Sequence, residues 1–182
     1  MPAASATPLF DSLLVAQLGD RPELAEALCA LLGRALAGDA PAMPLWIAGP
    51  GQTGKTVLAR AFEALFPPDA VGYPESARSA IPPGAAVLLA HERPDADVFR
   101  ALDGGALPGL AVCNLPPPPR AEGAGRLALF RFDNRVEEPD HDLLPRILAA
   151  ELPALRARLL FASRALSDHA DPWAALPEGV VA

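Results

Sequence analysis

The sequence predicts an α/β fold in which a parallel sheet is covered by helices on both faces. Three short apolar runs, at residues 45–48, 85–90 and 110–113, indicate buried strands, because parallel strands carry almost continuous apolar sequence. Segments with helical spacing of apolar residues alternate with these runs. A glycine-rich loop, GPGQTGKT at residues 49–56, lies between the first strand and a helix. Ligands of such sheets bind at the carboxyl ends of the strands, where this loop is placed.

Length and composition indicate one domain with a substantial core. The chain has 182 residues, of which 51% are apolar, and this length suits one ordinary domain better than two. Its 22 prolines and 14 glycines predict many turns. The two cysteines, Cys29 and Cys113, lie outside any CxxC or Cys/His ligand spacing. Neither a disulfide framework nor a zinc site is therefore predicted.

The N-terminal part of the chain predicts two helices. The first covers residues 8–18, with Thr7 as its N-cap and a proline at its first helical position. At the start of the second, Asp20 with Glu23 three residues later resembles a capping arrangement. Leucines then recur at helical spacing until Gly38, which ends the pattern.

The rest of the chain alternates between helix and strand signals. In chain order, the further expected elements are a helix over 55–66, a turn-rich stretch over 67–84, a helix over 95–102, a strand over 126–132, and helical sequence over 142–166 broken near Pro153. The tail after residue 166 is expected to be irregular, with Trp173 docking back on the domain.

The net charge and the hydropathy of the sequence limit which partners and which cellular compartment can be expected. The net charge is −7 at neutral pH, which disfavours nonspecific attraction to nucleic acid, so any DNA contact is expected to be local. No uncharged apolar run reaches the roughly 18 residues that a membrane span needs. Residues 1–10 have no basic region before an apolar segment. We therefore expect a cytoplasmic protein without a membrane partner.

The glycine loop matches the pattern GxxxxGK[ST] of P-loop NTPases through Gly49, Gly54, Lys55 and Thr56. Its glycines allow backbone N–H groups to turn toward phosphate oxygens, and the following helix directs its positive end at them. We expect Lys55 to reach the β- and γ-phosphates of ATP, and the Thr56 hydroxyl to bind Mg²⁺. The expected ATP-binding segment is Gly49, Pro50, Gly51, Gln52, Thr53, Gly54, Lys55 and Thr56.

Lys55 is also the one lysine among fifteen basic residues, the others being arginines. The excess of alanine, proline and arginine suggests a GC-biased coding sequence, which replaces lysine by arginine wherever the exchange is tolerated. A planar, forked guanidinium group does not fit a nest built for a compact ammonium group. The retained lysine therefore indicates a position that does not tolerate arginine.

Polar residues end the next two strands. The run VLLAHE ends in His91 and Glu92, at the place where carboxylates of ATP hydrolases hold Mg²⁺ through water and orient the attacking water. We predict this role for Glu92, with a solvated strand-end carboxylate as the alternative. His91 stands where an acidic residue is expected, and it is interpreted as an ordinary loop histidine. Asp95 and Asp97 are interpreted either as acidic residues that replace it or as residues that cap the next helix. Asn114 is predicted to contact the γ-phosphate or the lytic water.

The order of these motifs resembles the superfamily III helicases, specifically the AAA+ ATPase domain of poxvirus and of phage or plasmid primase-helicases. The resemblance runs from about Phe10 to Leu166. It is carried by the helical lead-in and Walker A segment LCALLGRALAGDAPAMPLWIAGPGQTGKTVLARAFEALF, by VLLAHE as Walker B, by LDGG, VCNLPPPP and RLALFRF, and by the closing helices LLPRILAAELPALRARLLFASRAL. The fold expectation becomes an AAA+-like P-loop sheet divided into a helical lead-in (1–43), a nucleotide-binding core (44–135), C-terminal helices (136–166) and a tail (167–182).

The resemblance implies ATP and Mg²⁺ as cofactors, Glu92 as the Walker B acid and Asn114 as the sensor residue. It makes Arg126 a candidate arginine finger that enters the site of a neighbouring subunit, with Arg120 and Arg131 as alternatives. A finger supplied in this way requires a homo-oligomer, of which a hexameric ring is one form. Single-stranded DNA and a replication protein such as a primase are candidate partners, and the bacterial host cytoplasm is the expected compartment for a phage-encoded chain.

The sequence departs from this family between Gly105 and Asn114, which only eight residues separate, none of them basic. The family's basic hairpin, which grips single-stranded DNA, is therefore expected to be missing, although Arg100 stands near the place of its usual lysine. Unwinding is accordingly less expected than nucleotide binding.

Two other function classes stay open. One is a small-molecule P-loop kinase, for which the loop residues Arg78, Arg93 and Arg120 could bind a substrate. The other is a nonhydrolysing nucleotide-binding or assembly module, suggested by His91 and by the missing hairpin. The sequence has no NKxD-type guanine motif, so a GTPase is not expected.

Overall fold

The computed structural model describes residues 6–19, 21–39, 42–73, 85–92, 107–114, 116–117 and 125–181. The centre of this part of the chain is a five-stranded sheet in the order β2-β3-β4-β1-β5, in which every neighbouring pair of strands is parallel. Its strands are β1 (Leu45–Ala48), β2 (Val71–Gly72), β3 (Val87–Glu92), β4 (Gly109–Cys113) and β5 (Ala128–Arg131). The predicted α/β class with a parallel sheet and flanking helices is confirmed.

The helices are α1 (Pro8–Leu18), α2 (Pro22–Ala37), α3 (Lys55–Glu63), α5 (Leu143–Ala150) and α6 (Leu152–Ser167), with 3₁₀ turns η1 (Pro68–Ala70) and η2 (Pro172–Ala175). The bounds predicted for α1 and β1 are confirmed, as is the break between α5 and α6. Other bounds were wrong: α3 ends at Glu63 rather than at residue 66, β3 covers 87–92 rather than 85–90, and β5 covers 128–131 rather than 126–132. Strand β4 begins one residue earlier than predicted, at Gly109. The stretch from residue 67, predicted to be rich in turns, also forms η1 and β2.

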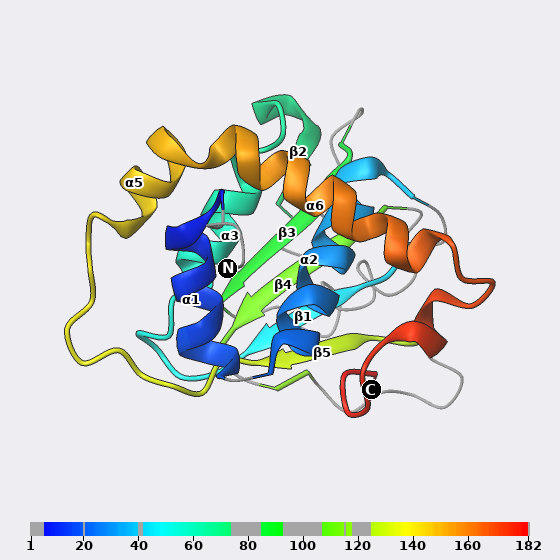
Figure 1. Ribbon diagram of the computed structural model, residues 1–182, viewed down its shortest axis with the longest axis horizontal. Coiled ribbons are helices and arrows are strands. Elements are labelled where there is room, and N and C mark those ends of the chain that lie inside the picture. The colour runs from blue at the N-terminus through cyan, green and yellow to red at the C-terminus, as the bar shows by residue number, and fades with distance from the viewer. Residues whose placement is uncertain are drawn as a thin grey trace, which may run out of the picture.

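The apolar core lies mainly on one face of the sheet. Alternate strand residues point to opposite faces, so Ile47 and its neighbour Trp46 belong to different apolar clusters. The larger cluster contains Ile47 and residues from α1, α2, α3, α5 and α6, and Figure 1 shows α2 and α6 crossing in front of the sheet. Each fully buried side chain such as Ile47 or Leu58 contributes roughly 1.5–3 kcal/mol. The helix predicted over 95–102 lies outside the described residues.

The register of the sheet brings three strand ends into one row. Strand β4 lies between β1 and β3, with Cys113 paired to Ala48 on one side and to Glu92 on the other. Because neighbouring strands lie about 4.8 Å apart, the backbone of Glu92 is roughly 10 Å from that of Ala48. The glycine loop and Asn114 follow directly after this row. Figure 1 shows the arrowheads of β4 and β1 ending beside α1.

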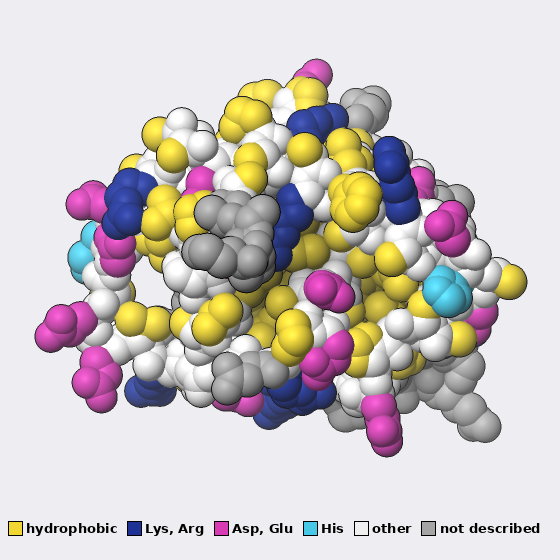
Figure 2. Space-filling model, viewed as in Figure 1, with side chains coloured by type: hydrophobic (Ala, Val, Ile, Leu, Met, Phe, Trp, Pro, Cys, Tyr) yellow, Lys and Arg dark blue, Asp and Glu magenta, His cyan; other side chains and the backbone are white. Residues whose placement is uncertain are grey.

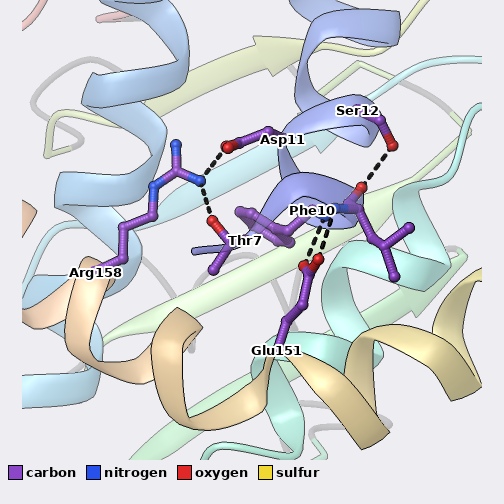
Figure 3. A network of polar contacts seen from close by, with 7 residues as sticks. Thr7, Phe10, Asp11, Ser12, Glu151 and Arg158 are labelled. Carbon is purple, nitrogen blue, oxygen red and sulfur yellow. Dashed lines mark hydrogen bonds and ion pairs between the residues drawn. The ribbon is translucent and has the colours of Figure 1, made fainter. Parts of the chain in front are cut away.

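A buried carboxylate ties α1 to the C-terminal helices (Figure 3). Glu151, between α5 and α6 and only 3% exposed, accepts hydrogen bonds from the backbone amides of Leu9 (2.7 Å) and Phe10 (3.0 Å). These amides belong to the first turn of α1, which has no acceptors inside the helix. Thr7 is the N-cap residue as predicted, but its side chain makes no capping bond and instead accepts from Arg158. Arg158 also pairs with Asp11.

The tail consists largely of turns and bends, as predicted, and it packs along the edge strand β5. Val181 forms an antiparallel bridge with Ala128 of β5, and the Leu129 amide donates to the carbonyl of Val180. Trp173 in η2 is partly buried against the main core, as predicted. Covering an edge strand in this way removes a template for unwanted strand pairing.

Helix α2 begins at Pro22 with Arg21 at the N-cap position, and Asp20, which the sequence suggested as its cap, lies outside the described residues. No helix in the described ranges combines the length and the apolar character that crossing a bilayer requires.

Candidate functional site

The glycine loop leaves β1 and enters α3, and after Gly49, whose amide donates to the Cys113 carbonyl at 3.3 Å, its backbone amides are unpaired in the described part of the chain. Within the described part of the chain, no amide from Gly51 through Val57 donates a hydrogen bond. Gly54 has φ +78°, and Gln52 has φ +64°, which makes Gln52 the only described non-glycine residue with a positive φ. Such a conformation is costly for a residue with a side chain and needs support from its surroundings. The loop therefore presents a run of free donors at the positive end of a helix.

Lys55 lies inside this loop rather than in solvent. Its side chain is 7% exposed, and its Nζ donates to the carbonyl oxygens of Gly49 (2.8 Å) and Pro50 (2.5 Å) and to Thr53 Oγ1 (3.1 Å). Burial lowers the pKa of the ammonium group below its ordinary value, and the nearby Cys113 and Asp133 oppose this shift. All three N–H bonds of the ammonium group are thus engaged by the loop itself.

A cavity of about 760 Å³ opens over the loop. This volume falls within the range of about 300–1,000 Å³ that is typical of small-molecule sites. Its floor is the segment from Gly51 to Val57, and one wall is α1 through Ser12, Leu13 and Ala16. The other walls are Asn114 at the end of β4 and the segment that leads into α5, from Val136 to Leu144.

The loop residues predicted from the sequence are thus brought together with Asn114, which is exposed and lines the same cavity. Glu92 reaches the same edge of the sheet one strand farther on, where its backbone pairs with Cys113. Thr56 is exposed in the first turn of α3 and also lines the cavity. The described residues contain no group of three or more metal-ligating His, Cys, Asp or Glu side chains.

Arg126 lies near the amino-terminal ends of the strands, whereas the glycine loop lies at their carboxyl ends. Arg126 precedes β5, and the first residue of β5 pairs with the first residue of β1, whereas the loop follows the last residue of β1. Its guanidinium group donates to both carboxylate oxygens of Asp171, at 3.2 and 2.8 Å, and lies 5.7 Å from the ring of Trp173. This hydrogen bond is the main cause that lowers the pKa of Asp171. The structure therefore does not bring Arg126 to the cavity of its own chain.

Arg131, one of the alternatives to Arg126, stands opposite Ala48 in the register and pairs with Asp133. The remaining residues that the sequence singled out lie outside the described residues; they are Arg78, Arg93, Asp95, Asp97, Arg100, Gly105 and Arg120.

Sequence reasoning missed a segment that holds the glycine loop from outside. We call residues 132–136, directly after β5, the strap. The Phe132 amide donates to the Ala48 carbonyl at 2.8 Å, and the Val136 amide donates to the Gln52 carbonyl at 2.9 Å. Polar, irregular sequence after a strand gives no signal of such contacts, because they depend on main-chain atoms rather than on side-chain type.

A second cavity, of about 730 Å³, lies between α2 and α6 and has different chemistry. Figure 2 shows apolar side chains gathered in the hollow on this face of the molecule. Its lining is largely apolar and includes Ala27, Ala30, Ala162 and Ala165, with the ring of Phe161 on its rim 72% exposed. Within the described residues, no run of unpaired main-chain amides lines it, so the cavity over the glycine loop is the better candidate for an anionic ligand.

Comparisons with known proteins support the fold. The chain is similar to the A-form apo structure of the C-terminal region of NrS-1, with a TM-score of 0.65, 12% identity, and coverage of 87% of this chain and 47% of that chain. A second apo structure of the same region gives a TM-score of 0.60, 13% identity, and coverage of 90% and 51%. The chain thus spans about half the length of these NrS-1 chains. No protein-family model and no curated protein matches the sequence. Likeness at this identity establishes a common fold.

Proposed function

We propose that the chain binds ATP with Mg²⁺ in the cavity over the glycine loop and hydrolyses it. One observation carries this proposal: the amides from Gly51 through Val57 have no acceptor in the described chain, and they surround the buried Lys55 at the start of α3. Phosphate oxygens are the ligands that such a nest of donors, combined with a helix N-terminus and an ammonium group, is suited to bind.

The residues present fit a Mg²⁺–triphosphate ligand. Thr56 places a hydroxyl oxygen in the cavity at the first turn of α3, and oxygen donors are what Mg²⁺ prefers. Because Mg²⁺ keeps several waters and takes part of its shell from substrate phosphates, a cage of protein carboxylates is not required. Lys55 would exchange the Gly49 and Pro50 carbonyls for phosphate oxygens, and the Thr53 hydroxyl remains within its reach.

Hydrolysis is assigned to the row of strand ends beside the loop. Asn114 lines the cavity and would donate to the γ-phosphate or hold the attacking water. Glu92, at the end of the next strand, would orient that water and bind Mg²⁺ through water. Both assignments rest on position at the carboxyl edge of a parallel sheet, where ligands of such sheets bind.

The wider role proposed is that of an AAA+ domain acting as a homo-oligomer in DNA replication, or as a reduced accessory to it. The order of motifs that resembles superfamily III helicases supports this role. Arg126 would serve a neighbouring subunit, which agrees with its half-exposed position away from the cavity of its own chain. A primase and single-stranded DNA are the proposed partners, and the bacterial cytoplasm is the proposed compartment.

The proposal is tested with purified wild-type protein, Lys55→Ala and Glu92→Gln. Binding of ATP with Mg²⁺ is measured by calorimetry, turnover by phosphate release with and without single-stranded DNA, and mass in solution by light scattering. We expect Lys55→Ala to lose binding, because it removes the positive charge from the nest. We expect Glu92→Gln to bind ATP but to lose turnover. Arg21→Ala, which removes an exposed cation outside the cavity, is the matched control and should behave as wild type.

The same measurements separate the two other classes. Turnover that depends on an added small-molecule phosphate acceptor, with a monomeric or dimeric mass, would indicate a kinase. Tight ATP binding without turnover in the wild type would indicate a nonhydrolysing module. Unchanged ATP binding by Lys55→Ala would refute the assigned site.

A further inference from the structure

Helix α1 and the strap pack against the glycine loop, and neither belongs to its sequence motif. A Cβ atom added to Gly54 would lie 2.3 Å from Leu13 Cδ1 of α1, and one added to Gly49 would lie 1.8 Å from the carbonyl oxygen of Phe132 in the strap. The backbone contact at Gly49 leaves no room for a side chain, whereas one at Gly54 would require the Leu13 side chain to shift. The two outer glycines of the motif therefore serve the packing of α1 and the strap against the loop, in addition to any approach of phosphate.

The strap is in turn fastened to the last turns of α1 by two hydrogen bonds. The Gln17 side chain, 5% exposed, donates from Nε2 to the main-chain carbonyl of Asn134 at 2.8 Å. The Asn134 side chain donates back to the carbonyl of Ala16 at 2.9 Å. Carbonyls in the last turn of a helix lack donors inside the helix, and Asn134 supplies a donor to the carbonyl of Ala16.

Two residues along the strap, the Val136 amide holds the Gln52 carbonyl. This bond fixes the orientation of the peptide group that follows Gln52, the described non-glycine residue with φ +64°. A change of Gln52 to a more common negative φ would reorient this peptide group and its Thr53 amide relative to the rest of the loop, and the bond from Val136 opposes such a change. The path from Gln17 through Asn134 and Val136 to Gln52 therefore supports the strained residue of the loop.

We propose that Gln17 is a positioning residue for nucleotide binding: by clamping the strap to α1, it holds the glycine loop in its phosphate-accepting form. This inference rests on the proposed function. Gln17 contacts the strap and does not line the cavity over the loop. Its effect reaches the ligand through the backbone of Val136 and Gln52.

One feature of Gln17 separates this role from a general contribution to stability. Its Oε1 is buried, with no hydrogen-bond partner in the described part of the chain. A buried acceptor without a partner is destabilising, so its removal offsets the loss of the donor, and the carbonyl of the exposed Asn134 can accept from water instead. Gln17→Met keeps the length of the side chain and removes both the clamping donor and the unpaired acceptor. We therefore expect its free energy of unfolding to equal or exceed that of the wild type, while its affinity for nucleotide falls.

The experiment measures two quantities on the full chain. Binding of ATPγS with Mg²⁺ is followed by calorimetry, and we expect Gln17→Met to weaken it roughly tenfold, the change that corresponds to one lost hydrogen bond. Exchange of the Val136 amide with deuterium is followed by NMR without nucleotide, and we expect it to be faster in Gln17→Met. Amides within α2 and α6 should exchange as in the wild type.

Ser167→Ala is the matched control. It removes hydrogen bonds to Asp39 and Arg34 that join the ends of α2 and α6, and none of these three residues lines the cavity over the loop. It should lower the stability of the fold and leave the affinity for ATPγS unchanged. Wild-type affinity in Gln17→Met, or a fall in affinity that only accompanies a loss of stability, would overturn the positioning role. If the wild type binds no nucleotide, the proposed function fails, and the exchange of Val136 still decides whether Gln17 holds the strap.

Discussion

The ammonium group of Lys55 donates to the carbonyl oxygen of Gly49, the first residue of its own loop, at 2.8 Å. Pro50 and Thr53 accept the other two hydrogen bonds of the ammonium group, so the loop is closed on its own lysine. Binding of a triphosphate would then exchange carbonyl acceptors for phosphate oxygens of greater negative charge, which form stronger hydrogen bonds with an ammonium group. The nest is therefore preorganised in backbone shape but must release its lysine when a ligand enters.

Burial of Lys55 predicts a specific dependence of stability on pH. Burial lowers the pKa of its ammonium group in the folded state, whereas in the unfolded chain the pKa stays near the ordinary value of 10.5. Between these two pKa values the unfolded state binds more protons, so stability rises with pH across this alkaline window. Urea unfolding at a series of alkaline pH values should show the wild type gaining stability relative to Lys55→Met. A difference that stays constant with pH would contradict the burial of a charged Lys55.

Two glycines with similar backbone conformations should respond differently to alanine. Gly54 and Gly38 have φ of +78° and +72°, so Gly→Ala costs about 1 kcal/mol of backbone strain at either position. A methyl group added to Gly54 contacts Leu13, whereas nothing lies within 4 Å of one added to Gly38. Gly54 also lies in the glycine loop, and Gly38 does not. Gly54→Ala should lose ATP affinity, and Gly38→Ala should keep it at a comparable loss of stability. Equal affinity in the two variants would argue against the nest.

The ion pair between Arg126 and Asp171 separates two roles for this arginine. As a finger in a neighbouring site, Arg126 is needed for turnover, and Asp171 competes for it. Arg126→Ala should then abolish turnover, while Asp171→Asn, which breaks the same ion pair, should keep or raise it. Phosphate release by each variant, and by a mixture of Arg126→Ala with Lys55→Ala, is the measurement. Equal losses in the two single variants would assign Arg126 to holding the tail.

Removal of the Glu151 charge should loosen α1. In Glu151→Gln, one of the two acceptors for the Leu9 and Phe10 amides becomes an NH₂ group that faces an N–H donor. Leaving a buried donor unsatisfied costs about 1–3 kcal/mol, and we expect a loss of this size in urea unfolding. Glu23→Gln is the control, because Glu23 pairs with Arg21 on the surface, and it should leave stability unchanged. A loss in Glu151→Gln no greater than in the control would show that the carboxylate does not cap α1.

The local elements could be predicted from the sequence because each is encoded within a few neighbouring residues. The strand at Leu45–Ala48, the glycine loop and the helix that starts at Lys55 form one continuous signal of apolar run, glycines and helical spacing. The same holds for α1 and for the break between α5 and α6. By contrast, β2 consists of two residues in proline-rich sequence, and no periodic pattern can reveal a strand so short.

What the sequence by itself determined is the run of free main-chain donors around one lysine, because glycines and a helix start fix it locally. Only the tertiary structure decided which residues stand beside that run. The order β2-β3-β4-β1-β5 placed Asn114 next to the loop, the pairing of β5 with β1 placed Arg126 at the far edge, and Gln17 met the strap across more than a hundred residues of sequence. Such contacts are set by how strands pair and helices pack. A hydrogen bond to a main-chain carbonyl does not depend on the residue type of either segment, so the sequence cannot predict it.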